Sequence, residues 1–132
     1  MIDGGQSQGP LLLISNLKDQ NEYLLTSSRQ RWVGWVLRDF AGLPKLVGGV
    51  GGQQFAAAIM AEVEAIRQGL EMVISSGVLE PGGSLVVESD SNGLIQMINQ
   101  EVTADVALDI YLQDIWRMAN LFQLVRFCFT PQ

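Results

Sequence analysis

The sequence predicts an α/β fold built on a five-stranded mixed sheet, and three observations support it. Segments rich in β-forming residues fill the first part of the chain. Helical periodicity begins only near residue 55, and strands and helices alternate after it. The predicted order is β-β-β-α-β-α-α-β. Three sequential strands favour an antiparallel meander, and the later alternation favours parallel pairing through right-handed crossovers.

The strands of the first third are predicted from composition. Residues 1–10 are polar and rich in Gly and Gln, which predicts a flexible arm before a domain over 11–132. Residues 10–15 (PLLLIS) resemble a short strand, and a mostly polar stretch follows up to residue 30. Residues 31–38 (RWVGWVLR) form the next predicted strand, and 45–48 return from a turn at 39–44 as a hairpin.

The helices follow a glycine-rich link. Residues 55–76 carry an apolar stripe at a spacing of three or four residues, and Gly77 is expected to end this helix. Residues 84–89 (SLVVES) lack clean alternation, as a buried parallel strand does. A short helix at 93–100, with Ser91 or Asp90 as its cap, a long helix at 104–122 and a strand at 123–129 complete the chain.

Composition limits the chemistry. The 132 residues contain 8 Lys and Arg, 14 Asp and Glu, no His and one Cys, with a formal charge of −6. These counts exclude Ser-His-Asp triads, Cys-His dyads, internal disulfides and zinc sites built by one chain. A metal must then be held by oxygen atoms, which favours Mg²⁺, Mn²⁺ or Ca²⁺. The acidic excess argues against broad binding to polyanions.

No targeting segment or membrane span is evident at the start of the sequence, since the apolar run at 11–14 is far too short to cross a bilayer. We therefore expect an intracellular protein that does not bind membranes.

Two carboxylates are candidate site residues. On a helical projection Glu62 lies about 70° from the centre of the apolar stripe, beside Ile66, which places it at the border of the buried face. Glu64 falls on the solvent side. Asp90 ends the predicted central parallel strand, where open α/β sheets bind ligands. The alternatives are a boundary glutamate that reaches water and an N-cap for the next helix.

Three weaker features have ordinary structural alternatives. The glycine cluster at 48–52 lies between a strand and a helix, but no Gly-Lys-Ser/Thr follows, so a flexible turn is favoured over a phosphate loop. Trp32 and Trp35 face opposite sides of a strand, so one is expected in the core and the other exposed, where base stacking is the alternative. Trp116 and Cys128 are expected to be packing residues.

Three segments in order resemble a family. Residues 34–39 (GWVLRD), 61–65 (AEVEA) with Gly69 and Leu70, and 87–91 (VESDS) are similar to the second strand, first helix and fourth strand of ribonuclease H-like domains of the reverse-transcriptase-like group common in plants. The resemblance spans about residues 31–131. It implies the ribonuclease H fold, with Glu62 and Asp90 matching two metal-binding carboxylates. In that family, clustered acids hold two Mg²⁺ ions at the scissile phosphodiester of an RNA–DNA hybrid; one ion generates hydroxide and the other stabilises the leaving oxygen.

The sequence departs from the family pattern in two places. The family's first acid lies in an Asp-Gly pair that ends the first strand, roughly a dozen residues before the glycine matching Gly34. Asp19 has nearly this spacing but is followed by Gln20, and the pair Asp3-Gly4 lies too far upstream. The sequence also lacks the family's histidine near Phe129 and the final helix that carries the last aspartate. These departures predict one weakly held Mg²⁺ or none.

Two functions follow as hypotheses. The first is a nucleic-acid-associated domain that hydrolyses RNA in RNA–DNA hybrids with Mg²⁺, weakly or no longer, using Glu62, Asp90 and, as a third ligand, Asp19. Arg29, Arg31 and Arg38 would supply a small positive patch. The second is a non-catalytic protein-interaction module or homo-oligomer on the same fold. In that case Val125, Phe127 and Phe129 would line an uncovered face of the last strand.

Overall fold

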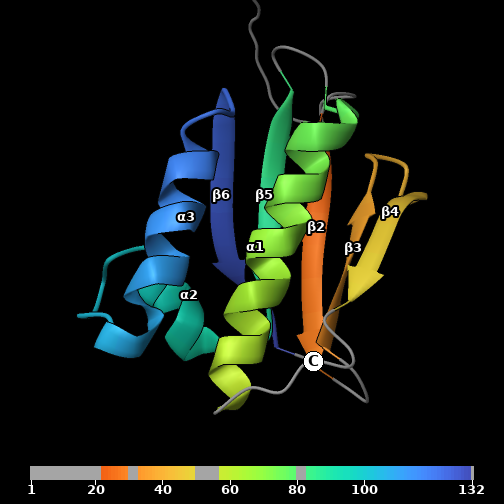
Figure 1. Ribbon diagram of the computed structural model, residues 1–132. Coiled ribbons are helices and arrows are strands. Elements are labelled where there is room, and N and C mark those ends of the chain that lie inside the picture. The colour runs from red at the N-terminus through yellow and green to blue at the C-terminus, as the bar shows by residue number, and fades with distance from the viewer. Residues whose placement is uncertain (1–21, 30–32, 50–56, 80–82, 132) are drawn as a thin grey trace, which may run out of the picture.

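A computed structural model describes residues 22–29, 33–49, 57–79 and 83–131, and its centre is a mixed five-stranded sheet (Figure 1). The strand order is β4-β3-β2-β5-β6. Strands β2, β3 and β4 pair antiparallel, whereas β5 pairs parallel with both β2 and β6. The strands are β2 (Glu22–Arg29), β3 (Val33–Arg38), β4 (Pro44–Gly49), β5 (Ser84–Ser89) and β6 (Leu124–Phe129). The predicted antiparallel meander followed by parallel strands is confirmed.

The first strand of the meander differs from the prediction. Residues 22–29 (EYLLTSSR) form the central strand β2, although the sequence pattern indicated a mostly polar connection there. Pairing on both sides explains the difference, because hydrogen bonds to β3 and β5 stabilise a segment whose own β-propensity is low. The strand predicted at residues 10–15 lies outside the described residues.

Three α-helices are present in the described part of the chain. They are α1 (Ala58–Ser76), α2 (Asn92–Ile98) and α3 (Asp109–Ala119). Gly77 ends α1 in the left-handed region with φ 69°, as expected. The long helix expected at 104–122 is shorter, because a separate 3₁₀ turn at Val106–Leu108 precedes α3 and the side chain of Asp105 caps that turn.

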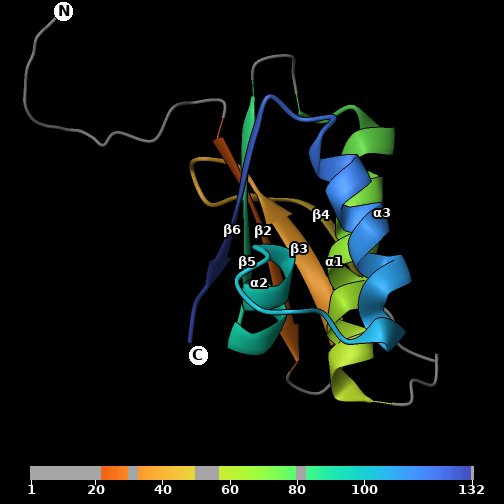
Figure 2. The same cartoon turned by 90° about the vertical axis from the view of Figure 1, so that its left-hand side faces the viewer.

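The hydrophobic core lies between the sheet and the two long helices, α1 and α3, which cover the same face (Figure 2). Its fully buried members include Leu25, Leu37, Val63, Ile66, Leu70, Val87 and Leu112. Val125 and Phe127 pack against this core. The expectation that these two residues line an uncovered face is therefore wrong, because parallel pairing with β5 turns them toward the helices beside Leu85 and Val87.

The tryptophans that the structure describes have packing roles. Trp35 is a core residue, as expected for one of the pair, and Trp32 lies outside the described residues. The indole Nε1 of Trp116 donates a hydrogen bond to the carbonyl oxygen of Ile98 at 2.9 Å, which links α3 to the end of α2. This contact confirms that Trp116 packs at a boundary between elements.

Candidate functional site

The carboxyl ends of β2 and β5 bring two buried hydroxyl groups side by side. Ser27 pairs with Ser89 in the parallel register, and the two residues are 2% and 1% exposed. Ser89 Oγ accepts a hydrogen bond from the backbone N–H of Ser91 at 3.1 Å. Ser27 Oγ has no hydrogen-bond partner among the described residues. A buried polar atom without a partner is unusual and marks this edge of the sheet as a candidate site.

Helix α1 places Glu62 at the same edge. Gly69 lies directly against Leu25, where an added Cβ would be 3.0 Å from Leu25 Cδ1. The first turns of α1 lie beside the carboxyl end of β2 (Figure 1). Glu62 is two turns before Gly69, about 10 Å along the helix. Ser27 is about 7 Å past Leu25 in the same direction. Glu62 and Ser27 therefore lie at nearly the same level.

Glu62 is only 6% exposed. The alternative interpretation of Glu62, as a boundary glutamate that reaches water, is therefore wrong. A buried ionisable side chain at the edge of a sheet where ligands bind is a functional-site candidate.

Asp90 directly follows β5 and is half-buried. It is not the cap of α2, because Ser91 Oγ accepts the hydrogen bond from Leu94 N at 3.3 Å. The N-cap alternative for Asp90 is therefore wrong, and its role as a metal ligand stays a prediction. Asp19, the third predicted ligand, lies outside the described residues.

Ser27 is a site residue that the sequence analysis missed. The resemblance expects an acid at the end of the first strand, and that strand ends at residues 27–29 rather than a dozen residues before Gly34. Ser27 is the buried residue at this end that faces α1. Counting strand alternation through residues 24–28 (LLTSS) would have identified it, because Leu25 and Ser27 then share one face.

The donor atoms do not fit a pair of Mg²⁺ ions. They comprise the carboxylates of Glu62 and Asp90 and the hydroxyls of Ser27 and Ser89. Among the described residues, no three Asp, Glu or Cys side chains come together as a group that could hold a metal ion. Two divalent cations would bring four positive charges to two negative ones, whereas two-metal sites use several carboxylates. The residues present therefore do not support a two-metal reaction at this site.

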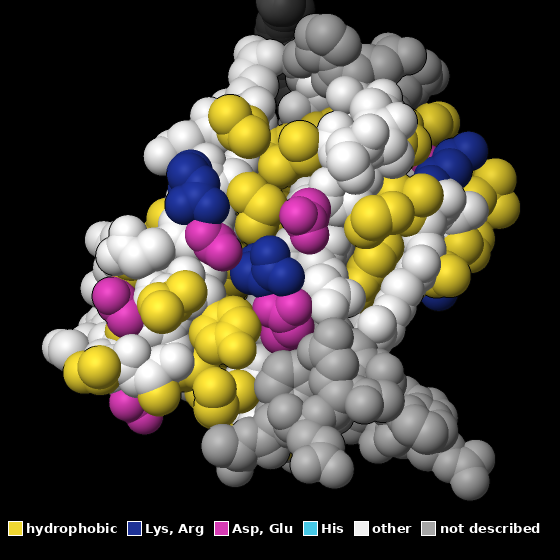
Figure 3. Space-filling view, viewed as in Figure 1, with side chains coloured by type: hydrophobic (Ala, Val, Ile, Leu, Met, Phe, Trp, Pro, Cys, Tyr) yellow, Lys and Arg dark blue, Asp and Glu magenta, His cyan; other side chains and the backbone are white. Residues whose placement is uncertain are grey.

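Several basic side chains of the described residues have an acidic or carbonyl partner close by. Lys45 lies 3.6 Å from Asp39, and Arg126 lies 3.9 Å from Glu22. Arg38 donates to the carbonyl oxygen of Gly42 in the turn after β3. On the helix face, basic and acidic side chains lie next to one another (Figure 3). The expected patch of Arg29, Arg31 and Arg38 is not tested, because the side chain of Arg29 and all of Arg31 lie outside the described residues.

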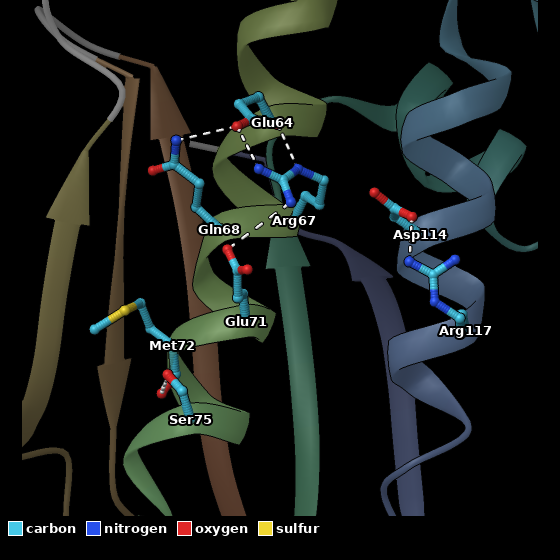
Figure 4. A network of polar contacts seen from close by, with 8 residues as sticks. All are labelled: Glu64, Arg67, Gln68, Glu71, Met72, Ser75, Asp114 and Arg117. Carbon is cyan, nitrogen blue, oxygen red and sulfur yellow. Dashed lines mark hydrogen bonds and ion pairs between the residues drawn. The ribbon is translucent and has the colours of Figure 1, made fainter.

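A second polar cluster lies on α1 (Figure 4). Arg67 donates to both carboxylate oxygens of Glu64, at 2.6 and 2.8 Å, and Gln68 adds a bond at 3.1 Å. Glu64 is 8% exposed, so its predicted place on the solvent side is wrong. Arg67 and Gln68 contact its carboxylate, and α3 packs beside α1. The hydrogen bonds from Arg67 lower the pKa of Glu64 below its ordinary value of 4.5.

This ion pair predicts acid sensitivity. Because the folded-state pKa of Glu64 is lowered, the pair stabilises the fold above pH 4.5, and this contribution is lost as pH falls through the folded-state value. Arg67→Met should lower the free energy of unfolding at pH 7 by about 1–2 kcal/mol. It should also flatten the loss of stability on acidification. Urea denaturation between pH 7 and pH 3 measures both effects.

Arg117→Met is the matched control, because Arg117 pairs with Asp114 on α3 but is 70% exposed. It should change stability by less than about 0.5 kcal/mol. Some acid sensitivity remains in both variants, because the backbone N–H of Leu43 lowers the pKa of Asp39. Equal pH dependence in wild-type protein and Arg67→Met would contradict the prediction.

Comparison with known proteins agrees with this architecture. RNase H1 from the archaeon Halobacterium salinarum superposes with a TM-score of 0.69 at 17% identity, over 84% of this chain and 85% of that one. The N-terminal RNase H domain of a Mycobacterium tuberculosis protein gives 0.68 at 15% identity, over 84% and 83%. An RNase H1 known as LC11, solved in complex with an RNA/DNA hybrid, gives 0.67 at 15% identity, over 84% and 85%. No curated protein sequence matches the chain.

The sheet order, the helices on one face and these superpositions define a ribonuclease H-like fold. The model of the reverse transcriptase-like family matches residues 24–132, and the chain belongs to that family. None of the helices in the described part of the chain combines the length and apolarity needed to cross a membrane.

Proposed function

We propose that the chain is a ribonuclease H-like, nucleic-acid-associated domain whose hydrolysis of RNA in RNA–DNA hybrids is weak or lost. The observation that carries the proposal is Ser27, a buried hydroxyl at the strand end where the family resemblance expects a carboxylate. The remaining acids, Glu62 and Asp90, lie at the same edge as Ser27. This supports descent from a metal-dependent nuclease and explains why its activity would be reduced.

At most one Mg²⁺ is compatible with this site. Glu62 and Asp90 would be its carboxylate ligands, and water would fill the other positions, since Mg²⁺ retains several waters when few carboxylates are available. Asp19 remains the third candidate ligand. Glu22, three residues after Asp19, pairs with Ser84 at the other end of β5 from Asp90. We therefore expect a smaller effect from Asp19→Asn than from Asp90→Asn.

A cleavage assay tests the proposal. The substrate is an end-labelled RNA–DNA hybrid, incubated with Mg²⁺ or Mn²⁺ beside an active RNase H1. We expect cleavage at least about a hundredfold slower than that of the active enzyme, because losing a single electrostatic partner of the transition state lowers rates by about 10²–10³-fold. Any residual cleavage should disappear in Glu62→Gln and Asp90→Asn.

Two outcomes would contradict parts of this proposal. Rapid, metal-dependent cleavage that both substitutions abolish would show that the site is active despite Ser27. Cleavage that survives both substitutions would remove Glu62 and Asp90 from the site. Retention of the hybrid in a binding assay with little cleavage would support the nucleic-acid association by itself.

The alternative, a non-catalytic interaction module or homo-oligomer, is favoured by exposed apolar side chains near the start of α3. Val106 is 88% exposed and Ile110 is 76% exposed. Val106 lies in the 3₁₀ turn that precedes α3, and Ile110 lies in the first turn of α3, so the two exposed side chains are close in sequence. Large exposed apolar patches mark interaction sites. Light scattering over a concentration series tests self-association. A protein that stays monomeric at the highest concentration would count against the homo-oligomer.

A further inference from the structure

The face of the sheet opposite α1 and α3 carries no helix in the described part of the chain (Figure 2). Leu25, Ser27 and Val87 are buried on the helix side, so the alternating residues Leu24 and Val86 lie on the opposite side. A hollow of about 170 Å³ lies there. Its lining includes Leu24, Val86, Phe40, Glu22, Glu88 and Arg126.

The aromatic wall of this hollow is held in place by a rigid turn. Phe40 follows Asp39, whose Oδ1 accepts hydrogen bonds from the backbone N–H groups of Ala41 and Leu43, both at 2.9 Å. The turn therefore fixes the backbone on either side of Phe40. The Phe40 side chain is nevertheless 45% exposed. A fixed aromatic residue beside an apolar floor is a preformed binding surface that lacks a cover in the described residues.

An apolar segment of the same chain lies close in sequence to the hollow. Residues 11–14 (LLLI) are four consecutive aliphatic residues in a mostly polar stretch before Glu22, in which Leu17 is a further aliphatic residue. Glu22 itself lines the hollow, so the chain enters the described fold at its rim. Ile14 precedes Glu22 by eight residues, which can span at most about 29 Å. The eight residues of β2 make the open face of the sheet about 26 Å long, so residues 11–14 can reach any point along it.

Tethering favours this segment over a separate molecule. Residues joined to the rim by a connection of only seven residues have an effective concentration in the millimolar range, well above that of free protein in most experiments. Four aliphatic side chains are also better stabilised on Leu24, Val86 and Phe40 than in water. Carboxylates and Arg126 remain at the rim, where Arg126 lies 3.9 Å from Glu22 and both can stay hydrated.

We propose that residues 11–14 of the chain dock on the open face of the sheet and cover the hollow beside Phe40. A double-mutant cycle in the full chain tests this contact. One variant changes Leu12 and Leu13 to Ser, a second changes Phe40 to Ala, and a third combines them. Urea denaturation gives the equilibrium constant for folding of each.

We expect the Leu12→Ser/Leu13→Ser variant to lower the folding constant about tenfold, because a half-buried aliphatic pair leaves the surface. If both changes remove the same contact, the fold-loss in the folding constant of the combined variant should be smaller than the product of the two separate fold-losses. We expect it to be smaller by a factor of at least about three. Leu43→Ala is the matched control: Leu43 is 59% exposed in the same turn but does not line the hollow. With Leu43→Ala the two losses should multiply.

The proposal would be overturned if the fold-losses in the folding constant multiply when Phe40→Ala is combined with Leu12→Ser/Leu13→Ser, as they should for Leu43→Ala. A shared contact that appears only at high protein concentration, together with a dimer mass in light scattering, would also overturn it, because the occupant would then be a second copy. Gln6→Ser/Gln8→Ser changes the same arm outside the aliphatic run and should leave the folding constant unchanged; an equal loss in that variant would again contradict docking of residues 11–14.

Discussion

Ser27→Asp is expected to destabilise the metal-free protein strongly and to make its stability depend on divalent cations. The substitution puts a carboxylate into a position that is 2% exposed, at the same level as Glu62. Two buried like charges in a low-dielectric site destabilise a fold by several kcal/mol. A bound cation between the two carboxylates would reduce the repulsion between them.

Thermal melts with and without Mn²⁺ or Mg²⁺ measure this effect. We expect a fall of about 3–5 kcal/mol in the free energy of unfolding without metal. A cation at a hundred times its dissociation constant should restore about 2.7 kcal/mol. The wild-type protein should respond much less, because its site has two carboxylates. Electron paramagnetic resonance of bound Mn²⁺ gives the affinities directly.

Thr26→Asp is the matched control for this experiment. Thr26 is the neighbouring residue of β2, and alternation turns its side chain to the open face, away from Glu62. It is expected to change stability less and to show no recovery with metal. The same recovery in both variants, or none in Ser27→Asp, would remove Ser27 from the site.

The helical half of the fold could be predicted because its signals are local. The apolar stripe of α1 and the glycine that ends it are both visible in the sequence, and the limits of β5 agree with the predicted segment. Strand β2 could not be predicted, because residues 26–29 (TSSR) resemble a loop. Their strand conformation depends on two partners, β3 and β5, that are distant in sequence.

The same distinction explains what was predicted of the site. Glu62 could be predicted from the apolar stripe of its helix, and Asp90 from the end of its strand, because both signals are local in the sequence. The burial of Glu64 is accompanied instead by its contact with Arg67 and by the packing of α3 beside α1, neither of which the helical projection includes. Ser27 is uncharged and was therefore not a candidate ligand, and its position at the site is known only from its pairing with Ser89 across β2 and β5.

Gly48→Ala is expected to destabilise the meander, because the ring of Trp35 occupies the space of the missing side chain. Trp35 and Gly48 are direct partners across β3 and β4. A Cβ at Gly48 would lie 2.4 Å from Cζ2 of Trp35 and 2.6 Å from Cε2. The indole is 6% exposed and packs in the core, so it cannot move outward without disturbing Leu37 and its other neighbours.

We expect a loss of about 1–3 kcal/mol in the free energy of unfolding, the usual effect of overpacking a core. Urea denaturation followed by tryptophan fluorescence measures the loss, and the emission spectrum of the folded variant should change if the ring of Trp35 shifts. Gly93→Ala is the control, because nothing lies within 4 Å of a Cβ there and the residue is in α2. It should be neutral or stabilising by up to about 1 kcal/mol. Equal stability of Gly48→Ala and wild-type protein would show that Trp35 does not hold β4 against the core in this way.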